Sequence, residues 1–315
     1  MKKTIFLILG LLSTIAATSQ IQLTQYYMDG TLYNPAMAGS KGAICSGLSG
    51  RQQWMNFTDP LGNHVSPRSI VFNISSPLYS INSGVGLNII YDEAAFESNT
   101  GFKLNYVYRI PLQNEKNHLG LGIGLSVLNK VIRFDQLITE QQGDPLLKLN
   151  DRESGIIPDL DFGIIYQNAE KFNIAVSAVN LMESSAEIGN VRTGNNRQFY
   201  LLTDYRIKLS DSRRQSLVLI PSLFLKTNTQ NSQMDISTRV EFNNRYWGGL
   251  SYRYQDAIAI IDGLNINGFR IGASYDISIG KLSVATPGSM EIFLGYCYSI
   301  TPKVKLNSLY NTRYL

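Results

Sequence analysis

Strict alternation of apolar and polar residues is the dominant pattern along this chain. In residues 101–110, Phe, Leu, Tyr and Ile at the even positions alternate with mostly small or polar residues at the odd positions. The same period of two returns at 119–127, 159–166, 234–242 and 269–277. Because successive side chains of a β-strand point to opposite faces, this period predicts strands with one apolar and one polar face. The fold class is therefore all-β.

Thirteen candidate strands can be placed in this way, each near the roughly 9 to 11 residues that a tilted strand needs to cross a bilayer. They lie at 42–55, 66–77, 83–92, 100–112, 117–129, 157–168, 171–181, 197–208, 215–227, 233–243, 246–255, 265–277 and 289–300. A single-chain bacterial barrel has an even number of strands. We therefore expect about fourteen, within a range of 12 to 16, and we expect the missing one in a terminal segment or in residues 130–137.

The polar face of these strands distinguishes a membrane barrel from a soluble sandwich. In a sandwich this face meets bulk water and is rich in Lys, Glu and Thr. Here it is mostly Gly, Ser and Asn, with charges of both signs at Lys103, Arg109, Asp161, Arg206, Asp235, Arg239, Glu241, Arg253 and Arg270. Small residues and opposite charges suit a wet or plugged lumen, and an apolar face with Tyr and Phe near the strand ends suits lipid. We expect a closed antiparallel transmembrane β-barrel.

Connections between the predicted strands alternate in length, which gives the barrel an orientation. Short turns fall at 78–82, 113–116, 169–170, 209–214 and 244–245, and longer polar loops at 56–65, 93–99, 130–156, 182–196 and 256–264. Short turns of outer-membrane barrels face the periplasm and long loops face outward. The loops 130–156 and 182–196 are therefore the expected cell-surface features. The connection 278–288 breaks the order, because it is long where a short one is due.

The N-terminus predicts a secretory signal peptide over residues 1–19. Lys2 and Lys3 precede an apolar run over 5–12, and small residues then lead to Gln20 as the expected mature start. The alternative, a membrane anchor, needs roughly 20 apolar residues, and this run is shorter. Because no later run is long enough for a spanning helix, membrane insertion must use strands, and only a closed barrel pairs every backbone group in lipid. We expect Sec export to a Gram-negative outer membrane.

Composition and charge narrow the function further. The 315 residues are 44% hydrophobic and only 17% charged, with 26 Gly and 18 Tyr, whereas ordinary soluble domains are about a quarter charged. The net charge of +4 comes from scattered Lys and Arg, so there is no basic face for nucleic acid. No internal repeat or linker divides the chain, and residues 20–315 are predicted to form one domain.

No arrangement of residues predicts catalysis, a cofactor or a metal. The two histidines, His64 in an outer loop and His118 beside a periplasmic turn, are expected at opposite ends of the barrel, too far apart for a shared metal or a catalytic base. Asp159 and Asp161 favour a lumen ion-pair network over a glycosidase pair. The glycines of 120–124 occupy every second strand position without a following Lys-Ser/Thr, so they clear space on the lumen side instead of binding phosphate.

The two cysteines leave two interpretations open. Cys45 shares the non-lipid face of the first predicted strand with Arg51, and Cys297 shares that of the last with Glu291. Both fall near the periplasmic end, and the first and last strands of a closed barrel are neighbours. A disulfide across this seam is sterically allowed in an oxidising compartment. We favour two unpaired buried thiols, because one missed terminal strand would separate the cysteines.

Several short motifs follow one another along the chain. Their residues are Gln25 and Tyr26; Asn34, Pro35, Ala36, Ala38 and Gly39 of an Asn-Pro-Ala-x-Ala-Gly segment; Arg51 and Trp54 of Arg-x-x-Trp; and Asn311 and Arg313 near the end. Together, in this order, they resemble the PorP/SprF family of type IX secretion system outer-membrane proteins. Longer matches cover 158–164, 243–253 and 269–276. The chain departs from the family at Met28-Asp29-Gly30-Thr31, where an aromatic pair is frequent, and this leaves the identity of its partner open.

The resemblance implies a barrel similar to long-chain fatty-acid channels, with residues 20–41 at or inside the barrel, and a place in the Bacteroidota type IX machinery. Pro35 supports part of this, since it favours a turn and cannot enter a central strand. We expect a non-enzymatic component that exports, retains or anchors a large secreted adhesin, or its C-terminal domain, alongside other secretion or gliding-motor components. The alternative is an outer-membrane pore or transporter for a small hydrophobic or ionic solute.

Overall fold

The computed structural model describes residues 21–59, 62, 65–112, 117–134, 152–168, 170–212, 215–228 and 230–300. Several features predicted from the sequence lie outside these residues: the signal peptide with Gln20, His64, most of the loop 130–156, Asn311 and Arg313.

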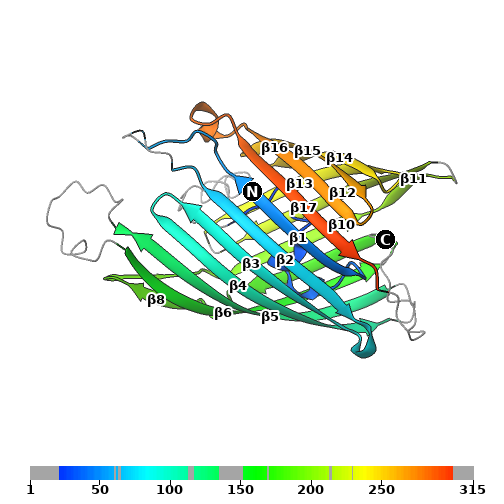
Figure 1. The fold of residues 1–315 in the computed structure, drawn as a ribbon, viewed down its shortest axis with the longest axis horizontal. Coiled ribbons are helices and arrows are strands. Elements are labelled where there is room, and N and C mark those ends of the chain that lie inside the picture. Colours follow the sequence, from blue (N-terminus) through cyan, green and yellow to red (C-terminus); the bar gives the residue numbers. More distant parts are fainter. Residues whose placement is uncertain are drawn as a thin grey trace, which may run out of the picture.

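The described residues form one antiparallel sheet that wraps into a barrel (Figure 1). Its strands are β1 (Ile44–Gln52), β2 (Arg68–Leu78), β3 (Ser83–Ala94), β4 (Glu97–Pro111), β5 (Asn117–Arg133), β6 (Arg152–Asn168), β7 (Phe172–Val179), β10 (Gln198–Tyr205), β11 (Ile207–Asp211), β12 (Ser216–Thr227), β13 (Ser232–Phe242), β14 (Tyr246–Arg253), β15 (Ala257–Ile266), β16 (Phe269–Ser278) and β17 (Ser289–Tyr298). β10 and β11 are one crossing interrupted at Arg206, since both pair with β12. The fifteen strands of this sheet in the described residues therefore make fourteen crossings, and the predicted number is confirmed.

The barrel closes between the first and last strands. β1 pairs with β2 on one side and with β17 on the other, from Ile44 opposite Tyr298 to Gln52 opposite Met290. Closure leaves no open edge along this seam, which is what a sheet in lipid requires because lipid offers no hydrogen bonds to unpaired backbone groups.

The strand that the sequence analysis missed is β15. It covers most of the predicted loop 256–264, so the expectation of a missing strand in a terminal segment or in 130–137 is wrong. Alternation fails to reveal β15 because both faces are apolar: Ala257, Ala259 and Ile261 are buried, while the isoleucines between them are exposed. A two-residue turn at 267–268, with positive φ at both positions, joins β15 to β16. With β15 in place, the long connection 279–288 falls at the same end as the other long loops.

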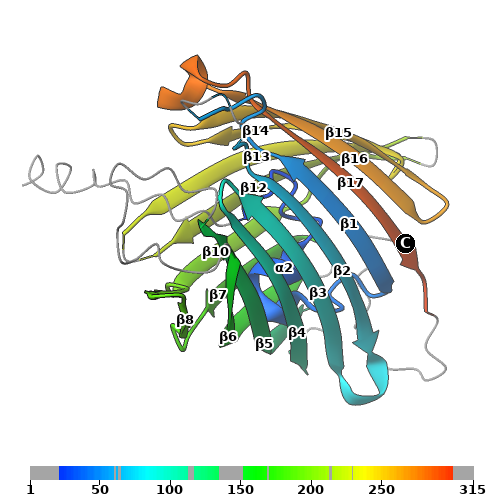
Figure 2. The ribbon, with the colours of Figure 1, turned by 60° about the vertical axis from the view of Figure 1, so that its left-hand side comes forward.

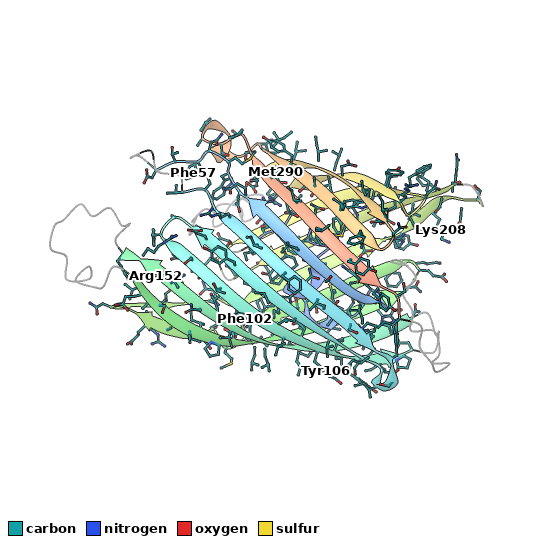
Figure 3. The ribbon with its side chains drawn as sticks, viewed as in Figure 1. Phe57, Phe102, Tyr106, Arg152, Lys208 and Met290 are labelled. Carbon is teal, nitrogen blue, oxygen red and sulfur yellow. A yellow bond between two sulfur atoms is a disulfide. The ribbon has the colours of Figure 1, made fainter. Side chains whose placement is uncertain are left out.

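The two faces of the strands point as predicted. Lys103, Arg109, Asp161 and Arg253 are among the inward charged residues, and each is no more than 5% exposed. Outward apolar side chains are exposed, for example Leu104 and Leu125 at 58% each, and Figure 3 shows such side chains standing on the outside of the barrel. Aromatic pairs lie near the short turns, where Phe172 contacts Tyr166 and Tyr205 with ring centroids 5.3 and 6.5 Å apart. The outer surface is therefore a lipid face with an aromatic rim.

The long-loop end carries additional ordered structure. The predicted loop 182–196 contains a hairpin of β8 (Ser185–Ile188) and β9 (Val191–Gly194). The loop after β1 is tied to the loop before β17, which includes the 3-10 turn η5 (Lys281–Val284), by a hydrogen bond from Met55 N to Gly288 O of 2.8 Å. At the opposite end, a 3-10 turn η2 (Tyr79–Ile81) joins β2 to β3. Within the described ranges, every helix is too short or too polar to cross a membrane.

Candidate functional site

Residues 21–43 lie inside the barrel and cross its lumen, and we call them the plug. They include a helical turn, α2 (Gly30–Tyr33), and a 3-10 turn, η1 (Pro35–Met37). Figure 2 shows α2 enclosed by the strands. The plug is not part of the sheet, yet the sheet surrounds it closely enough that Leu23, Gln25 and Ala36 are fully buried. The lumen is therefore filled by the chain's own N-terminal segment.

The plug begins on a network of charged side chains at the long-loop end. The backbone N–H groups of Thr24 and Gln25 donate to the two carboxylate oxygens of Glu291, at 2.7 and 2.9 Å. The Thr24 hydroxyl donates to Asp276 at 2.8 Å. Hydrogen bonds to charged acceptors are stronger than those between neutral groups. These three therefore bind the plug firmly to β16 and β17.

Two arginines form ion pairs with these buried carboxylates and with a third, that of Asp235. Arg51 on β1 lies 2.8 Å from Asp276 and 3.3 Å from Glu291, and Arg253 on β14 lies 3.0 Å from Asp276 and 3.1 Å from Asp235. Each of these five side chains is at most 6% exposed. Removing one member would leave a buried charge without its partner, which costs several kcal/mol. The motif residue Arg51 thus joins the barrel wall to the start of the plug.

Asn34 and Pro35 form the central attachment of the plug. The Asn34 amide donates to the backbone carbonyls of Ile164 on β6 at 3.2 Å and Val176 on β7 at 3.0 Å. Its own oxygen accepts from Ala36 N at 2.8 Å and so caps η1. Pro35 occupies the first position of η1, where a backbone N–H is not needed. One asparagine side chain therefore shapes the turn and fastens it to two strands.

Glycines on the wall make room for this segment. A Cβ on Gly163 of β6 would overlap the Asn34 side chain, and a Cβ on Gly122 of β5 would overlap the backbone of Ala36. The alternating glycines at 120–124 therefore do clear lumen space, as the sequence predicts. The turn η1 of the plug occupies this space at Gly122, and the side chains of Asn105 and Asp161 occupy it at Gly124. The plug backbone can approach the sheet closely only where the wall has no side chains.

Polar side chains of the wall also bind the carbonyl groups of α2, which the short helix leaves without partners. The Lys103 ammonium donates to Leu32 O at 2.8 Å and pairs with Asp161 at 2.7 Å. The other donors to plug carbonyls are Asn88 and Asn105 to Thr31 O, Ser177 to Tyr33 O, and Arg109 to Ala38 O. The charged residues that the sequence places in the lumen thus contact the plug directly.

Aromatic side chains fill part of the space around the plug. The ring of Tyr26 stacks on Phe224 of β12 with centroids 4.7 Å apart, and Tyr33 meets the same ring edge-on at 5.1 Å. The Tyr26 hydroxyl shares a hydrogen bond of 3.1 Å with Ser237 on β13. The motif residue Tyr26 is therefore a core residue of the lumen.

Asp29 belongs to the segment where the chain departs from the family pattern, and it faces β1 and β2. Ser49 and Asn73 both donate to its carboxylate, and the residue is only 1% exposed. This part of the plug therefore binds β1 and β2 through a buried side chain.

Not all predicted site residues meet in the lumen. Trp54 follows β1 at the long-loop end, where its backbone N–H donates to Ser289 Oγ at 3.0 Å and its ring contacts Phe57. His118 is buried near a short turn and shares a hydrogen bond of 2.8 Å with Gln167. Among the described residues, no group of three His, Cys, Asp or Glu side chains is placed to hold a metal ion.

Cys45 and Cys297 face each other across the seam and are joined by a disulfide. The favoured sequence interpretation, two unpaired thiols, assumed a strand between them. In the structure β1 and β17 pair directly, because the missed strand is β15 and not a terminal one.

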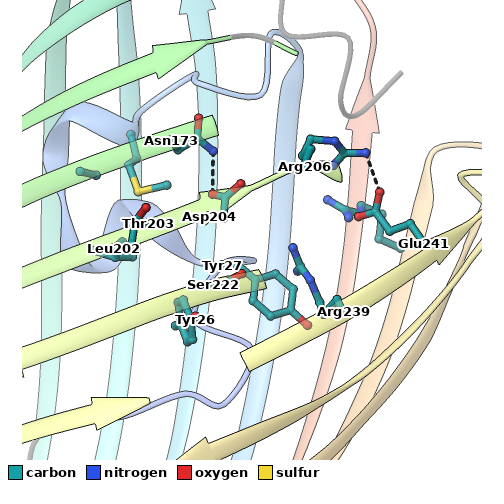
Figure 4. A pocket seen from close by; sticks show the side chains of 13 residues that line it. Tyr26, Tyr27, Asn173, Leu202, Thr203, Asp204, Arg206, Ser222, Arg239 and Glu241 are labelled. Carbon is teal, nitrogen blue, oxygen red and sulfur yellow. Dashed lines mark hydrogen bonds and ion pairs between the residues drawn. The ribbon is translucent and has the colours of Figure 1, made fainter. Parts of the chain in front are cut away.

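Two of the cavities that the plug leaves in the lumen lie at its opposite ends. The larger, of about 500 Å³, lies on the long-loop side between plug residues Leu32 and Tyr33 and wall residues that include Ile90 and Leu128. The smaller, of about 30 Å³, lies near the short turns (Figure 4).

The sequence pointed to Tyr26, Asn34 and Arg51 through the motif, but it offered no signal for the carboxylates that bind Thr24, because their role depends on which strands close the barrel.

Comparison with known proteins gives one family and a set of similar folds. The profile described as type IX secretion system membrane protein PorP/SprF matches residues 15–296. No curated protein sequence matches. A FadL homologue from Pseudomonas aeruginosa has a similar fold, with 9% sequence identity over 85% of this chain and 93% of that one and a TM-score of 0.47. The monoaromatic hydrocarbon channel TodX has 8% identity over 86% of this chain and 94% of that one, with a TM-score of 0.46. CdiB from Acinetobacter baumannii has 7% identity over 81% of this chain but only 60% of that one, with a TM-score of 0.42.

Proposed function

Because the chain belongs to the PorP/SprF family of type IX secretion system membrane proteins, we propose that it serves type IX secretion as a non-enzymatic binding component of the outer membrane. In this role it exports, retains or anchors a large secreted adhesin-type protein at the cell surface. Its partners are that protein or its C-terminal domain, together with other secretion or gliding-motor components. The proposal includes Sec export of the precursor in a bacterium of the Bacteroidota.

The plugged lumen is the observation that carries this proposal. The plug is held by Glu291 and Asp276 at one end, by β6 and β7 at its centre through Asn34, and by Arg109 near the short turns. A barrel closed in this way offers binding surfaces at its two ends instead of a path through its middle. At the long-loop end these surfaces are the β8–β9 hairpin, the two loops joined by the hydrogen bond from Met55 to Gly288, and the larger cavity, which Leu32 and Tyr33 line.

The same observation weighs against the alternative of a pore for a small solute. A solute would have to pass a segment that contacts the wall at Gly122 through the backbone of Ala36 and at Gly163 through the side chain of Asn34. Purified protein in planar bilayers should accordingly show no steady conductance. Steady conductance in the absence of any secretion partner would favour the pore.

A deletion strain tests the secretion role directly. Loss of the protein should abolish surface display of at least one large adhesin, and should impair gliding if the cell glides, while complementation restores both. A tagged copy isolated from native membranes should retain that adhesin or its C-terminal domain, identified by mass spectrometry. A deletion strain that displays all its adhesins and moves normally refutes the role.

A further inference from the structure

The larger cavity, at the long-loop end, is enclosed by three parts of the molecule. The plug supplies Leu32 and Tyr33, strands β3 to β5 supply one wall, and residues 193–196 after β9 supply another. Gly194 and Asn196 at this margin are exposed, so a ligand can enter from the long-loop side. The volume of about 500 Å³ lies within the usual range of ligand pockets, roughly 300 to 1,000 Å³.

The floor of this cavity is apolar and incompletely covered. Leu32 of α2, Ile90 of β3 and Leu128 of β5 line it, and each keeps part of its side chain exposed. Ile90 and Leu128 both pair with Gly101 of β4, and a Cβ on Gly101 would lie 3.3 Å from Leu128 and 3.6 Å from Ile90. The two side chains therefore lean together over a residue that has none. Because apolar surface is more stable out of water, this floor favours an apolar group over water.

The rim of the cavity is rich in amide groups. Among the described residues, the asparagines that line it are Asn99, Asn180, Asn195 and Asn196. The side-chain oxygen of Asn99 is buried and accepts no hydrogen bond within the described residues, although buried polar groups nearly always have a partner. An amide side chain can both donate and accept, as a peptide group does. The rim therefore suits a ligand that carries neutral donors and acceptors.

The charged groups of this lining already have partners. Lys130 lies 2.8 Å from Glu97, and Asp92 accepts a hydrogen bond from Ser69 at 2.5 Å. Within the described part of the lining, Lys130 is the cation present, so no unpaired cation is left there to hold a carboxylate or a phosphate. The lining therefore selects an uncharged group over the head of a fatty acid or a phospholipid.

We propose that this cavity binds a neutral, extended segment of the secreted protein. One apolar side chain of the segment covers Leu32, Ile90 and Leu128, and a backbone N–H beside it donates to the Asn99 oxygen. A peptide meets both requirements, because each residue can carry an apolar side chain and also has a backbone donor and acceptor. An acyl chain covers the floor but leaves the amides unpaired, whereas water or a sugar bonds the amides but leaves the floor wet. This inference rests on the proposed secretion role, since that role supplies the partner.

Cross-linking in intact cells identifies the occupant. Because Cys45 and Cys297 are joined, Asn196→Cys places a reactive thiol at the rim, and benzophenone maleimide attached to it captures what lies in the cavity on illumination. We expect mass spectrometry of the purified, tagged protein to find one segment of a secreted surface protein, cross-linked at or next to an apolar residue. Thr58→Cys is the control, since Thr58 is exposed at the same end but outside this cavity, and it should not capture that segment. Capture of lipid, of polysaccharide, of another part of this chain or of nothing at Asn196→Cys overturns the proposal, as does equal capture at Thr58→Cys.

The captured segment, made as a synthetic peptide, then tests the fit. It should bind the purified barrel in nanodiscs saturably, and replacing its apolar anchor residue by Ser should weaken binding about tenfold or more, because a buried apolar side chain is lost. Leu128→Trp fills the floor and should weaken binding similarly. Val127→Trp is the matched control, because Val127 is the preceding residue of β5 and faces lipid, so binding should be unchanged.

Heat-modifiable migration on gels checks that both Trp variants are folded. Wild-type affinity in Leu128→Trp overturns the cavity as the binding site but leaves the secretion role intact, because the deletion strain tests that role separately. A deletion strain that displays every adhesin refutes both.

Discussion

Replacement of Asn34 by Ala isolates the central attachment of the plug. The substitution removes three hydrogen bonds, to Ile164 O at 3.2 Å, to Val176 O at 3.0 Å and from Ala36 N at 2.8 Å. Each is worth about 0.5 to 1.5 kcal/mol net, so together they contribute about 3 kcal/mol to seating the plug. At 1.4 kcal/mol for each factor of ten, this loss raises the unseated fraction of the plug about a hundredfold.

Hydrogen exchange followed by mass spectrometry measures this change, because buried amides of the plug exchange when the segment opens. Peptides covering residues 31–40 should exchange about a hundredfold faster in Asn34→Ala, while peptides from β3 to β6 keep their protection. Asn228→Ala is the control, since Asn228 lies in a turn at the rim and caps only that turn. Wild-type exchange of the plug in Asn34→Ala would refute the reasoning, as would equal acceleration throughout the barrel.

Two further predictions concern the seam and the glycines. Unreduced protein should show no alkylatable thiol by mass analysis, because Cys45 and Cys297 are joined; two alkylated cysteines would exclude the disulfide. Gly122→Val should displace η1 of the plug and make the segment sensitive to protease in otherwise folded barrels, because its side chain would overlap Ala36; an unchanged cleavage pattern would contradict this.

The outer face of the barrel was predictable because lipid acts on each strand separately. Any outward residue between the two rims meets hydrocarbon, so Leu104 and Leu125 must be apolar whatever their neighbours are. The alternation and the direction of the side chains follow from that local requirement, whereas the number of strands followed from the rule that such barrels have an even number. β15 escaped detection because Ala257, Ala259 and Ile261 face the interior, where they are as apolar as the lipid-facing residues between them.

The sequence by itself determined the class of fold, the inward placement of Lys103, Arg109 and Arg253, and the family motif around Asn34. Only the tertiary structure decided what these residues touch: that Thr24 binds Glu291 across 267 positions of sequence, that glycines of β5 and β6 accept the plug, and that Cys45 meets Cys297. The physical reason is that a strand's exposure to lipid is a property of its own residues. A contact across the lumen depends instead on the number of strands, their register and the closure of the ring, and a single unseen strand changes every one of these pairings.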